Sequence, residues 1–183
     1  MIVGFTVFEK IKKLDLKKFE EICVIITHLH NDHCGSLSQF ILYNWFVNNK
    51  KTTVISKCEK IKDYLEITGT TKEAYFISDN YLNIEFIKTE HVKELDAYGF
   101  RMNLKDKSFV YTGDTCILEP FIPYLNKCDE FYVDVSKNGG VHLKFESIKE
   151  ELSKIKNNGT KVVLMHIDDR EYVKELNNNE FYI

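Results

Sequence analysis

Two patterns of apolar and polar positions recur along the chain. Short apolar runs predict strands, and apolar residues three to four positions apart predict amphipathic helices. Runs rich in Val, Ile, Phe and Tyr, bounded by polar or turn residues, predict strands. These runs cover residues 2–8, 22–27, 53–56, 74–77, 82–89, 97–104, 108–112, 130–135 and 161–167. Helical spacing of apolar residues, as in Phe145, Ile148, Leu152 and Ile155, predicts helices. The helices cover residues 36–48, 57–68, 145–157 and 169–177.

The order of these elements predicts an α/β fold. Strands and helices alternate in the first and last thirds of the chain, whereas the middle third contains strands only. This pattern is typical of mixed sheets whose faces are covered by helices. The chain has only 2 prolines and no Ser/Gly-rich tract that would act as a linker. We therefore expect one domain over residues 1–183.

Polar clusters follow four of the predicted strands. THLHNDH follows ICVIIT, TEH follows LNIEFIKT, TGDT follows SFVYT, and MHIDD follows KVVL. Sites in layered α/β folds are assembled where strands end. Because each cluster offers a histidine or an aspartate, we expect them to form one site.

The stretch THLHNDHCGSL, residues 27–37, carries the strongest chemical signal. His28 and His30 are two residues apart, so they point the same way in an extended segment. A turn after them brings Asp32 and His33 to the same place. Imidazoles and carboxylates are ligands for zinc and other first-row metals. A solvated polar loop is the alternative interpretation, but three histidines and an aspartate at this spacing favour a metal.

The later clusters are weaker when each is taken alone. His91 alone would be a surface residue, and His166 alone a buried, hydrogen-bonded histidine. GDT alone would be a turn in which Gly113 takes a positive φ and Asp114 caps. Their value for the metal interpretation comes from occurring together with residues 27–37.

The HxHxDH pattern and its order along the chain resemble the metallo-β-lactamase superfamily. His91 in KTEHVKELDAYGFRM resembles the third histidine of that family, Asp114 in VYTGDT the bridging aspartate, and His166 in VVLMHI the final histidine. The resemblance covers about residues 20–168. It implies a four-layer αββα sandwich.

The resemblance also implies two divalent metal ions, with zinc as the first choice and manganese or iron as alternatives. The ligands divide into two sets and one shared residue: His28, His30 and His91 for one ion, Asp32, His33 and His166 for the other, and Asp114 for both. Two cations about 3.5–4 Å apart can share a hydroxide and lower its pKa towards neutrality. We expect this hydroxide to attack the substrate, with Asp32 also as a catalytic residue.

Within the superfamily, the chain resembles the ribonuclease Z and phosphodiesterase-like branch. Lactamases usually lack the bridging aspartate, so hydrolysis of β-lactams is disfavoured. His142 in GGVHLKFES resembles the histidine of that branch that protonates a leaving alkoxide. A surface loop position is the alternative interpretation of His142. We therefore expect a phosphodiesterase that acts on a small nucleotide or an RNA-like substrate. Two alternatives stay open: a hydrolase of carboxylic esters, thioesters or lactones, and a non-catalytic metal-binding scaffold.

Two departures from the family narrow the expectation. The N-terminal hairpin with its DxG-like element is not visible, so either one or two outer strands are missing or the gene product is shortened. A partner chain can supply a missing edge strand, which favours a homodimer. The long insertion and Gly-rich basic arm that grip transfer RNA are not visible either. A small phosphodiester, such as a nucleotide or a cyclic phosphate, therefore fits better than transfer RNA.

Composition adds few constraints. The net charge of −3 does not indicate nucleic-acid binding. The 5 cysteines form no CxxC pair, which predicts free thiols in a reducing compartment. No apolar run is long enough to cross a bilayer, and no charged region precedes the apolar start MIVGFTVF. We expect a cytoplasmic protein that acts on a small molecule and does not bind membranes.

Overall fold

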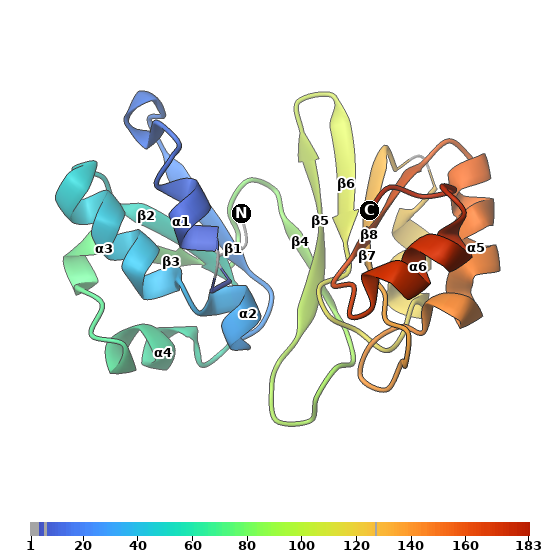
Figure 1. Cartoon of the computed structure of the whole chain (residues 1–183). Coiled ribbons are helices and arrows are strands. Elements are labelled where there is room, and N and C mark those ends of the chain that lie inside the picture. The colour runs from blue at the N-terminus through green and yellow to red at the C-terminus, as the bar shows by residue number, and fades with distance from the viewer. Residues whose placement is uncertain (1–3, 6, 127) are drawn as a thin grey trace. The chain divides into compact units, whose positions relative to one another are not determined.

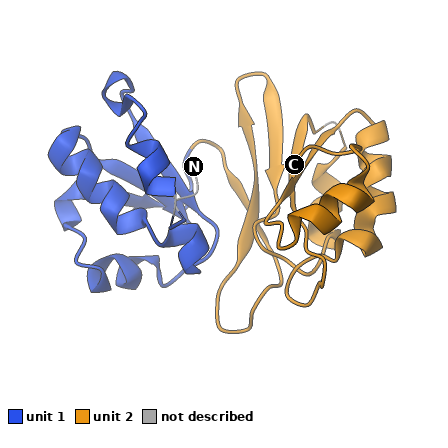
Figure 2. Cartoon of the chain, viewed as in Figure 1, with its two compact units in different colours: residues 1–81 blue, residues 82–183 orange. Residues whose placement is uncertain are grey.

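The computed structural model describes residues 4–5, 7–126 and 128–183. Contacts within the chain divide it into two compact units, which Figure 2 shows in different colours. We call Met1–Tyr81 the N-terminal unit and Leu82–Ile183 the C-terminal unit. The expectation of one domain over residues 1–183 stays a prediction.

The N-terminal unit is built on a parallel three-stranded sheet in the order β1-β2-β3. The strands are β1 (Ile22–Ile26), β2 (Thr52–Ser56) and β3 (Tyr75–Ser78), and the helices are α1 (Val7–Ile11), α2 (Asn31–Cys34), α3 (Leu37–Val47) and α4 (Ile61–Ile67). Short 3-10 turns lie at Leu16–Lys18 and Lys72–Ala74. Parallel neighbours need a crossover, and α3 and α4 provide the crossovers after β1 and β2. Ile22, Val24, Ile25 and Ile26 of β1 are buried, which explains why this strand is a continuous apolar run. In β2 the apolar residues Val54 and Ile55 are buried as well.

The C-terminal unit is built on a mixed five-stranded sheet in the order β4-β5-β6-β7-β8. Its elements are β4 (Glu85–Lys88), β5 (Tyr98–Leu104), β6 (Lys107–Tyr111), a 3-10 helix (Glu119–Tyr124), β7 (Glu130–Asp134), α5 (Phe145–Asn157), β8 (Lys161–Met165) and α6 (Arg170–Asn177). In Figure 1, α5 and α6 lie on the same side of β7 and β8. Phe121, Phe131 and Phe145 are fully buried in the apolar core of this unit.

The strand directions bring four strand ends together. β5 is antiparallel to both β4 and β6, and β6, β7 and β8 are parallel to one another. The carboxyl ends of β4, β6, β7 and β8 therefore lie at one edge of the sheet. Polar segments follow all four strands there, which agrees with the expected place of a site.

Most predicted elements are confirmed, and one is wrong. The strand predicted over residues 2–8 lies partly on residues 2, 3 and 6, which are outside the described residues, and its end belongs to α1. Phe8 and Ile11 are both buried and are three residues apart, so the period of this segment is helical. Among the described residues, no helix is long and apolar enough to span a membrane.

Candidate metal centre

Four predicted ligands of the N-terminal unit are grouped on the turn that follows β1. The side chains of His28 and His30 lie together, with Nε2 of His28 3.1 Å from Nδ1 of His30. α2 begins at Asn31 and turns the chain, so that His33 is packed against His28 with ring centroids 4.1 Å apart. Oδ2 of Asp32 is 3.5 Å from Nε2 of His33. One strand end and one helical turn thus bring all four side chains together.

A buried hydroxyl that the sequence interpretation missed lies behind these rings. Thr27 is fully buried, and its Oγ1 is 3.2 Å from Nδ1 of His28 and 3.4 Å from Nδ1 of His33. A polar partner on one ring nitrogen orients an imidazole and leaves its other nitrogen for a metal. The signal in the sequence is a polar residue that ends an apolar strand directly before the first histidine.

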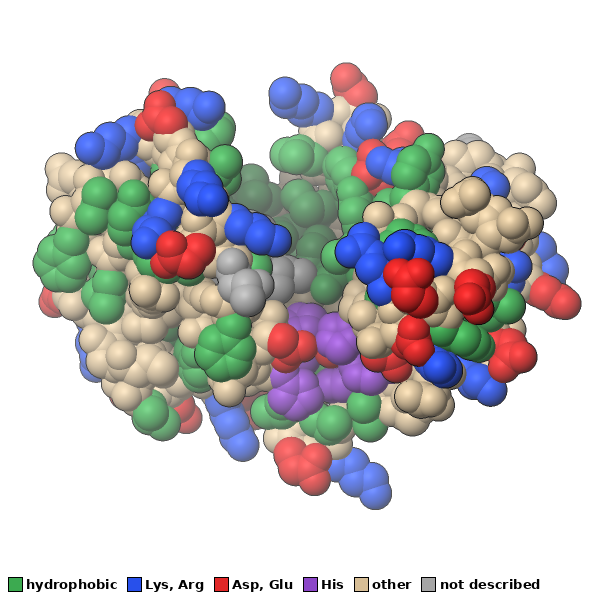
Figure 3. Space-filling model, viewed as in Figure 1, with side chains coloured by type: hydrophobic (Ala, Val, Ile, Leu, Met, Phe, Trp, Pro, Cys, Tyr) green, Lys and Arg blue, Asp and Glu red, His purple; other side chains and the backbone are tan. Residues whose placement is uncertain are grey.

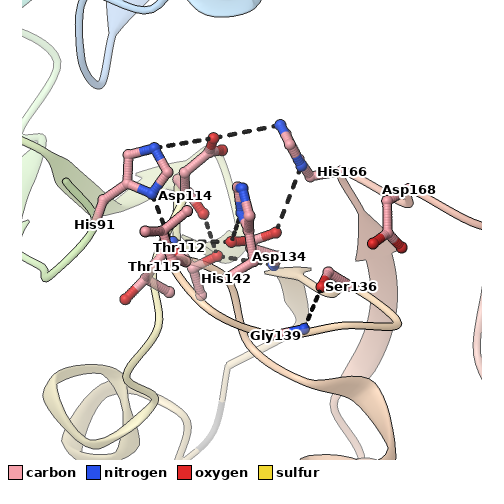
Figure 4. Close-up of polar contacts among 12 residues, drawn as sticks. His91, Thr112, Asp114, Thr115, Asp134, Ser136, Gly139, His142, His166 and Asp168 are labelled. Atoms are coloured by element: carbon pink, nitrogen blue, oxygen red, sulfur yellow. Dashed lines mark hydrogen bonds and ion pairs between the residues drawn. The ribbon is translucent and has the colours of Figure 1, made fainter.

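The candidate ligands of the C-terminal unit gather around Asp114. Gly113, with φ 61°, turns the chain after β6 and places the buried Asp114 at the sheet edge. Oδ2 of Asp114 is 3.7 Å from Nε2 of His91 and 3.3 Å from Nε2 of His166. Figure 4 shows the two rings approaching this carboxylate from opposite sides. The positive φ predicted for Gly113 is confirmed, and the turn presents Asp114 to both histidines.

The ring of His91 is held in one tautomer. Its Nδ1 is 2.9 Å from the carbonyl oxygen of Val141, which can only accept a hydrogen bond. Nδ1 therefore carries the proton and donates, and in the neutral ring the lone pair lies on Nε2. That lone pair faces the Asp114 carboxylate, an arrangement that a cation between the two atoms stabilises.

His166 follows β8 in a conformation that is unfavourable for most residues. Its φ is 54°, in the left-handed region that non-glycine residues seldom occupy. Such strain costs roughly 1–3 kcal/mol and is concentrated at functional sites. The bend turns the ring of His166 towards Asp114 at the edge of the sheet (Figure 4).

The donor sets fit a divalent metal ion. With zinc–nitrogen distances of roughly 2.0–2.1 Å and tetrahedral geometry, two donors on one ion lie about 3.3 Å apart. The separations given above for the pairs within each unit run from 3.1 to 3.7 Å. The donors are imidazole nitrogens and carboxylate oxygens, which suit zinc, manganese and iron. Each unit therefore contributes a set of residues with the chemistry and spacing of metal ligands.

His142 forms a different kind of pair, with a carboxylate that the sequence interpretation missed. Its Nδ1 is 2.8 Å from Oδ2 of the buried Asp134, a hydrogen-bond distance shorter than the ligand separations. The Asp134 carboxylate also accepts the backbone N–H of Thr115 at 2.9 Å. The hydrogen bond to Asp134 raises the pKa of His142, and burial raises the pKa of Asp134. The signal in the sequence is an aspartate that ends the apolar strand EFYVDV.

The position of His142 depends on the loop that carries it. The His142 ring stacks on His166, with centroids 4.5 Å apart and planes at 18°. Gly139 and Gly140 both have positive φ, and the Gly139 N–H donates to Oγ of Ser136 at 2.7 Å. With these two glycines before it, the ring of His142 lies between Asp134 and His166, as Figure 4 shows.

The five cysteines are free, as predicted. Burial raises the pKa of Cys34, which follows His33, to about 11. A thiol with so high a pKa is protonated and a poor ligand at neutral pH. Cys34 is therefore a buried packing residue beside the candidate ligand His33.

Comparison with known proteins identifies a family that this chain resembles. The family model for the anti-Pycsar protein Apyc1 matches residues 54–182. The anti-Pycsar protein Apyc1 of Bacillus phage 010DV004 is 26% identical over 178 residues, covering 80% of this chain and 68% of the relative.

Two solved structures show the fold. The metallo-β-lactamase fold protein YhfI from Bacillus subtilis has a TM-score of 0.75 and 17% identity, and the match covers 98% of this chain and 80% of YhfI. The short form of human tRNase Z has a TM-score of 0.63 and 15% identity, covering 93% of this chain and 82% of the other. The predicted metallo-β-lactamase fold is confirmed. The family and the fold agree with the expected enzyme class, a metal-dependent hydrolase. The chain belongs to the family of the anti-Pycsar protein Apyc1.

Proposed function

We propose that this chain is a metal-dependent phosphodiesterase that hydrolyses the phosphodiester bond of small nucleotides, including cyclic nucleotides. The observation that carries the proposal is the His142–Asp134 pair at 2.8 Å, stacked on the candidate ligand His166. A phosphodiester of a nucleoside releases an alkoxide, which needs a proton. An imidazole held by a buried carboxylate beside the metal ligands meets that need.

The metal ligands proposed are those that the family resemblance implies. They are His28, His30, Asp32, His33, His91, Asp114 and His166, and they would hold two divalent ions. The local distances and the tautomer of His91 support this assignment. When bound, the ions supply Lewis acidity that activates a water molecule and stabilises the charge on the phosphoryl oxygens.

The proposed role of His142 follows from its hydrogen bond. Since Nδ1 donates to the carboxylate of Asp134, Nε2 is the atom that can deliver a proton to the leaving oxygen. Asp134 acts as a positioning residue, because it holds the ring in one orientation and stabilises its protonated form. Its second contact, to the N–H of Thr115, anchors the carboxylate to the turn that carries Asp114.

The substrate class rests on three supports. The phage relative is named an anti-Pycsar protein, and one structural neighbour is named a tRNase, an enzyme that acts on RNA. The net charge of −3 does not favour a long polyanion. A phosphodiester the size of a nucleotide is chemically related to the RNA on which that neighbour acts. It is also small enough to bind to a chain with a net negative charge. Zinc as the native metal, a homodimer and a cytoplasmic location stay predictions.

The proposal is tested with metal-loaded protein on bis(p-nitrophenyl) phosphate and on the four common 3′,5′-cyclic mononucleotides. Metal content is measured in parallel, and His28→Ala serves as the inactive control. Turnover of both substrate types that is lost in His28→Ala supports a phosphodiesterase.

Two alternative functions have their own outcomes in this test. Metal-loaded protein that leaves phosphodiesters intact but cleaves p-nitrophenyl acetate or an acyl thioester would be an ester or thioester hydrolase. Metal-loaded protein that cleaves none of these substrates would favour the non-catalytic scaffold. Both outcomes contradict the proposed function.

A further inference from the structure

The residues Gly4 and Phe5 lie directly on the turn that carries the candidate ligands Asp32 and His33. A Cβ atom added to Gly4 would lie 1.8 Å from the carbonyl oxygen of Asp32. Only a glycine permits this approach, because no real side chain is tolerated at that distance from backbone. The backbone of Gly4 is therefore packed against the backbone of a proposed metal ligand.

A buried hydroxyl ties the same segment to the turn. Ser36 is 2% exposed, and its Oγ lies 2.8 Å from the carbonyl oxygen of Gly4 and 3.1 Å from that of Phe5. The single hydroxyl proton is shared between these two acceptors. Both residues are thus anchored by a side chain that follows His33 by three positions.

The Phe5 ring is held close to the turn but is not buried. A Cβ atom on Gly35 would lie 3.2 Å from Cδ1 of Phe5, so the ring rests over this glycine. Nevertheless Phe5 is 64% exposed. Its hydrogen-bonded backbone and its high exposure distinguish it from an aromatic residue that packs in a core.

Exposure alone would carry no conclusion, because single exposed apolar residues are normal on protein surfaces. The visible face of the N-terminal unit has several separate hydrophobic side chains among polar ones (Figure 3). Phe46, near the end of α3, is 73% exposed and serves as a comparison from the same unit. Phe5 differs from Phe46 because two glycines and a buried serine fix it beside the ligand turn.

We propose that Phe5 contacts the nucleobase of the substrate and is a specificity-determining residue. This inference rests on the proposed function, in which the phosphate is bound at the ligands of this turn. A phenylalanine ring stacks on any base, since every base has a π-face, and the contact tolerates different sequences. Phe5 would therefore raise affinity for nucleotides over phosphodiesters without a base, with little preference among bases.

The test compares two esters that share a leaving group. Thymidine 5′-(p-nitrophenyl phosphate) carries a base, methyl p-nitrophenyl phosphate does not, and both release p-nitrophenol. Phe5→Ala should raise KM for the thymidine ester roughly tenfold, the effect of losing one stacked base, with kcat unchanged. KM for the methyl ester should not change. Phe5→Trp should restore the wild-type KM, and Phe46→Ala, the matched control, should behave as wild type on both esters.

The outcomes separate this inference from the proposed function. If wild-type protein hydrolyses neither ester, the proposed function itself is refuted. If wild-type protein hydrolyses both but Phe5→Ala leaves the KM ratio of the two esters unchanged, the stacking role is wrong and the phosphodiesterase stands. An equal loss on both esters that Phe5→Trp does not restore would show a structural role for Phe5, which also refutes stacking.

Discussion

Replacing His142 by alanine should slow the reaction only where the leaving group needs a proton. General acid catalysis by a positioned side chain contributes roughly 100- to 10,000-fold to a rate. We expect a loss of that size in kcat for a cyclic mononucleotide, whose leaving group is an alkoxide. For bis(p-nitrophenyl) phosphate the loss should be a few-fold at most, because p-nitrophenolate leaves without protonation.

The loss in kcat expected for Asp134→Asn follows from its hydrogen bond to His142. The hydrogen bond from Nδ1 of His142 to Oδ2 of Asp134 is 2.8 Å long, and Asp134 is buried. Hydrogen bonds to charged groups contribute about 1.5–3 kcal/mol. At about 1.4 kcal/mol per factor of ten, Asp134→Asn should lower kcat for the cyclic nucleotide by roughly 10- to 100-fold. Its effect should lie below that of His142→Ala, and the double variant should be no slower than His142→Ala alone.

The assay is steady-state kinetics on both substrates, with the metal content of each variant measured on the same preparation. Full metal content is required for the comparison, because His142 stacks on the candidate ligand His166. Equal losses on the two substrates would refute the role of His142 as a proton donor. Additive losses in the double variant would refute the coupling of Asp134 to His142.

Three further predictions concern metal binding and stability. Asp114→Ala should lower the metal content per chain, measured by elemental analysis, and unchanged content with full rate would contradict its role as a ligand. In Gly99→Ala the new Cβ would lie 2.4 Å from a ring carbon of Phe121 and 2.5 Å from a backbone oxygen; such overpacking should lower the free energy of unfolding by about 1–3 kcal/mol in urea titrations. A hydrogen bond from Tyr132 lowers the pKa of Glu130. The resulting stabilisation is present above the unfolded pKa of about 4.3 and lost as pH falls through the folded pKa. Glu130→Gln should therefore be less stable than wild type at neutral pH, and the difference should shrink as the pH falls below about 4.

The fold could be predicted from the sequence wherever one period dominated. The sequence predicts a helix over residues 145–157, and α5 occupies Phe145–Asn157, with Phe145, Leu152 and Ile155 buried. The apolar runs 22–27 and 130–135 became β1 and β7, with changes of one residue at an end. Burial on one stripe or on both faces of a strand imposes these patterns directly.

Short segments were harder to predict because they offer too few positions to define a period. The composition of residues 2–8 predicts a strand, yet Val7–Ile11 is helical because Phe8 and Ile11 are buried together. Helix α2 contains only NDHC, and its composition indicated ligands rather than a helix. In both cases tertiary packing decided the local conformation, since a helix this short has little stability of its own.

The sequence by itself determined the kinds of side chain available and the strand ends where they lie. The spacing in THLHNDH and the later His91, Asp114 and His166 were enough to predict metal chemistry. Only the tertiary structure decided which partner each group has. Val141 holds the tautomer of His91, Thr27 lies behind two rings, and the buried Asp134 supports His142. Apart from the neighbours Thr27 and His28, these pairs are separated along the chain, so only folding brings them within hydrogen-bond distance.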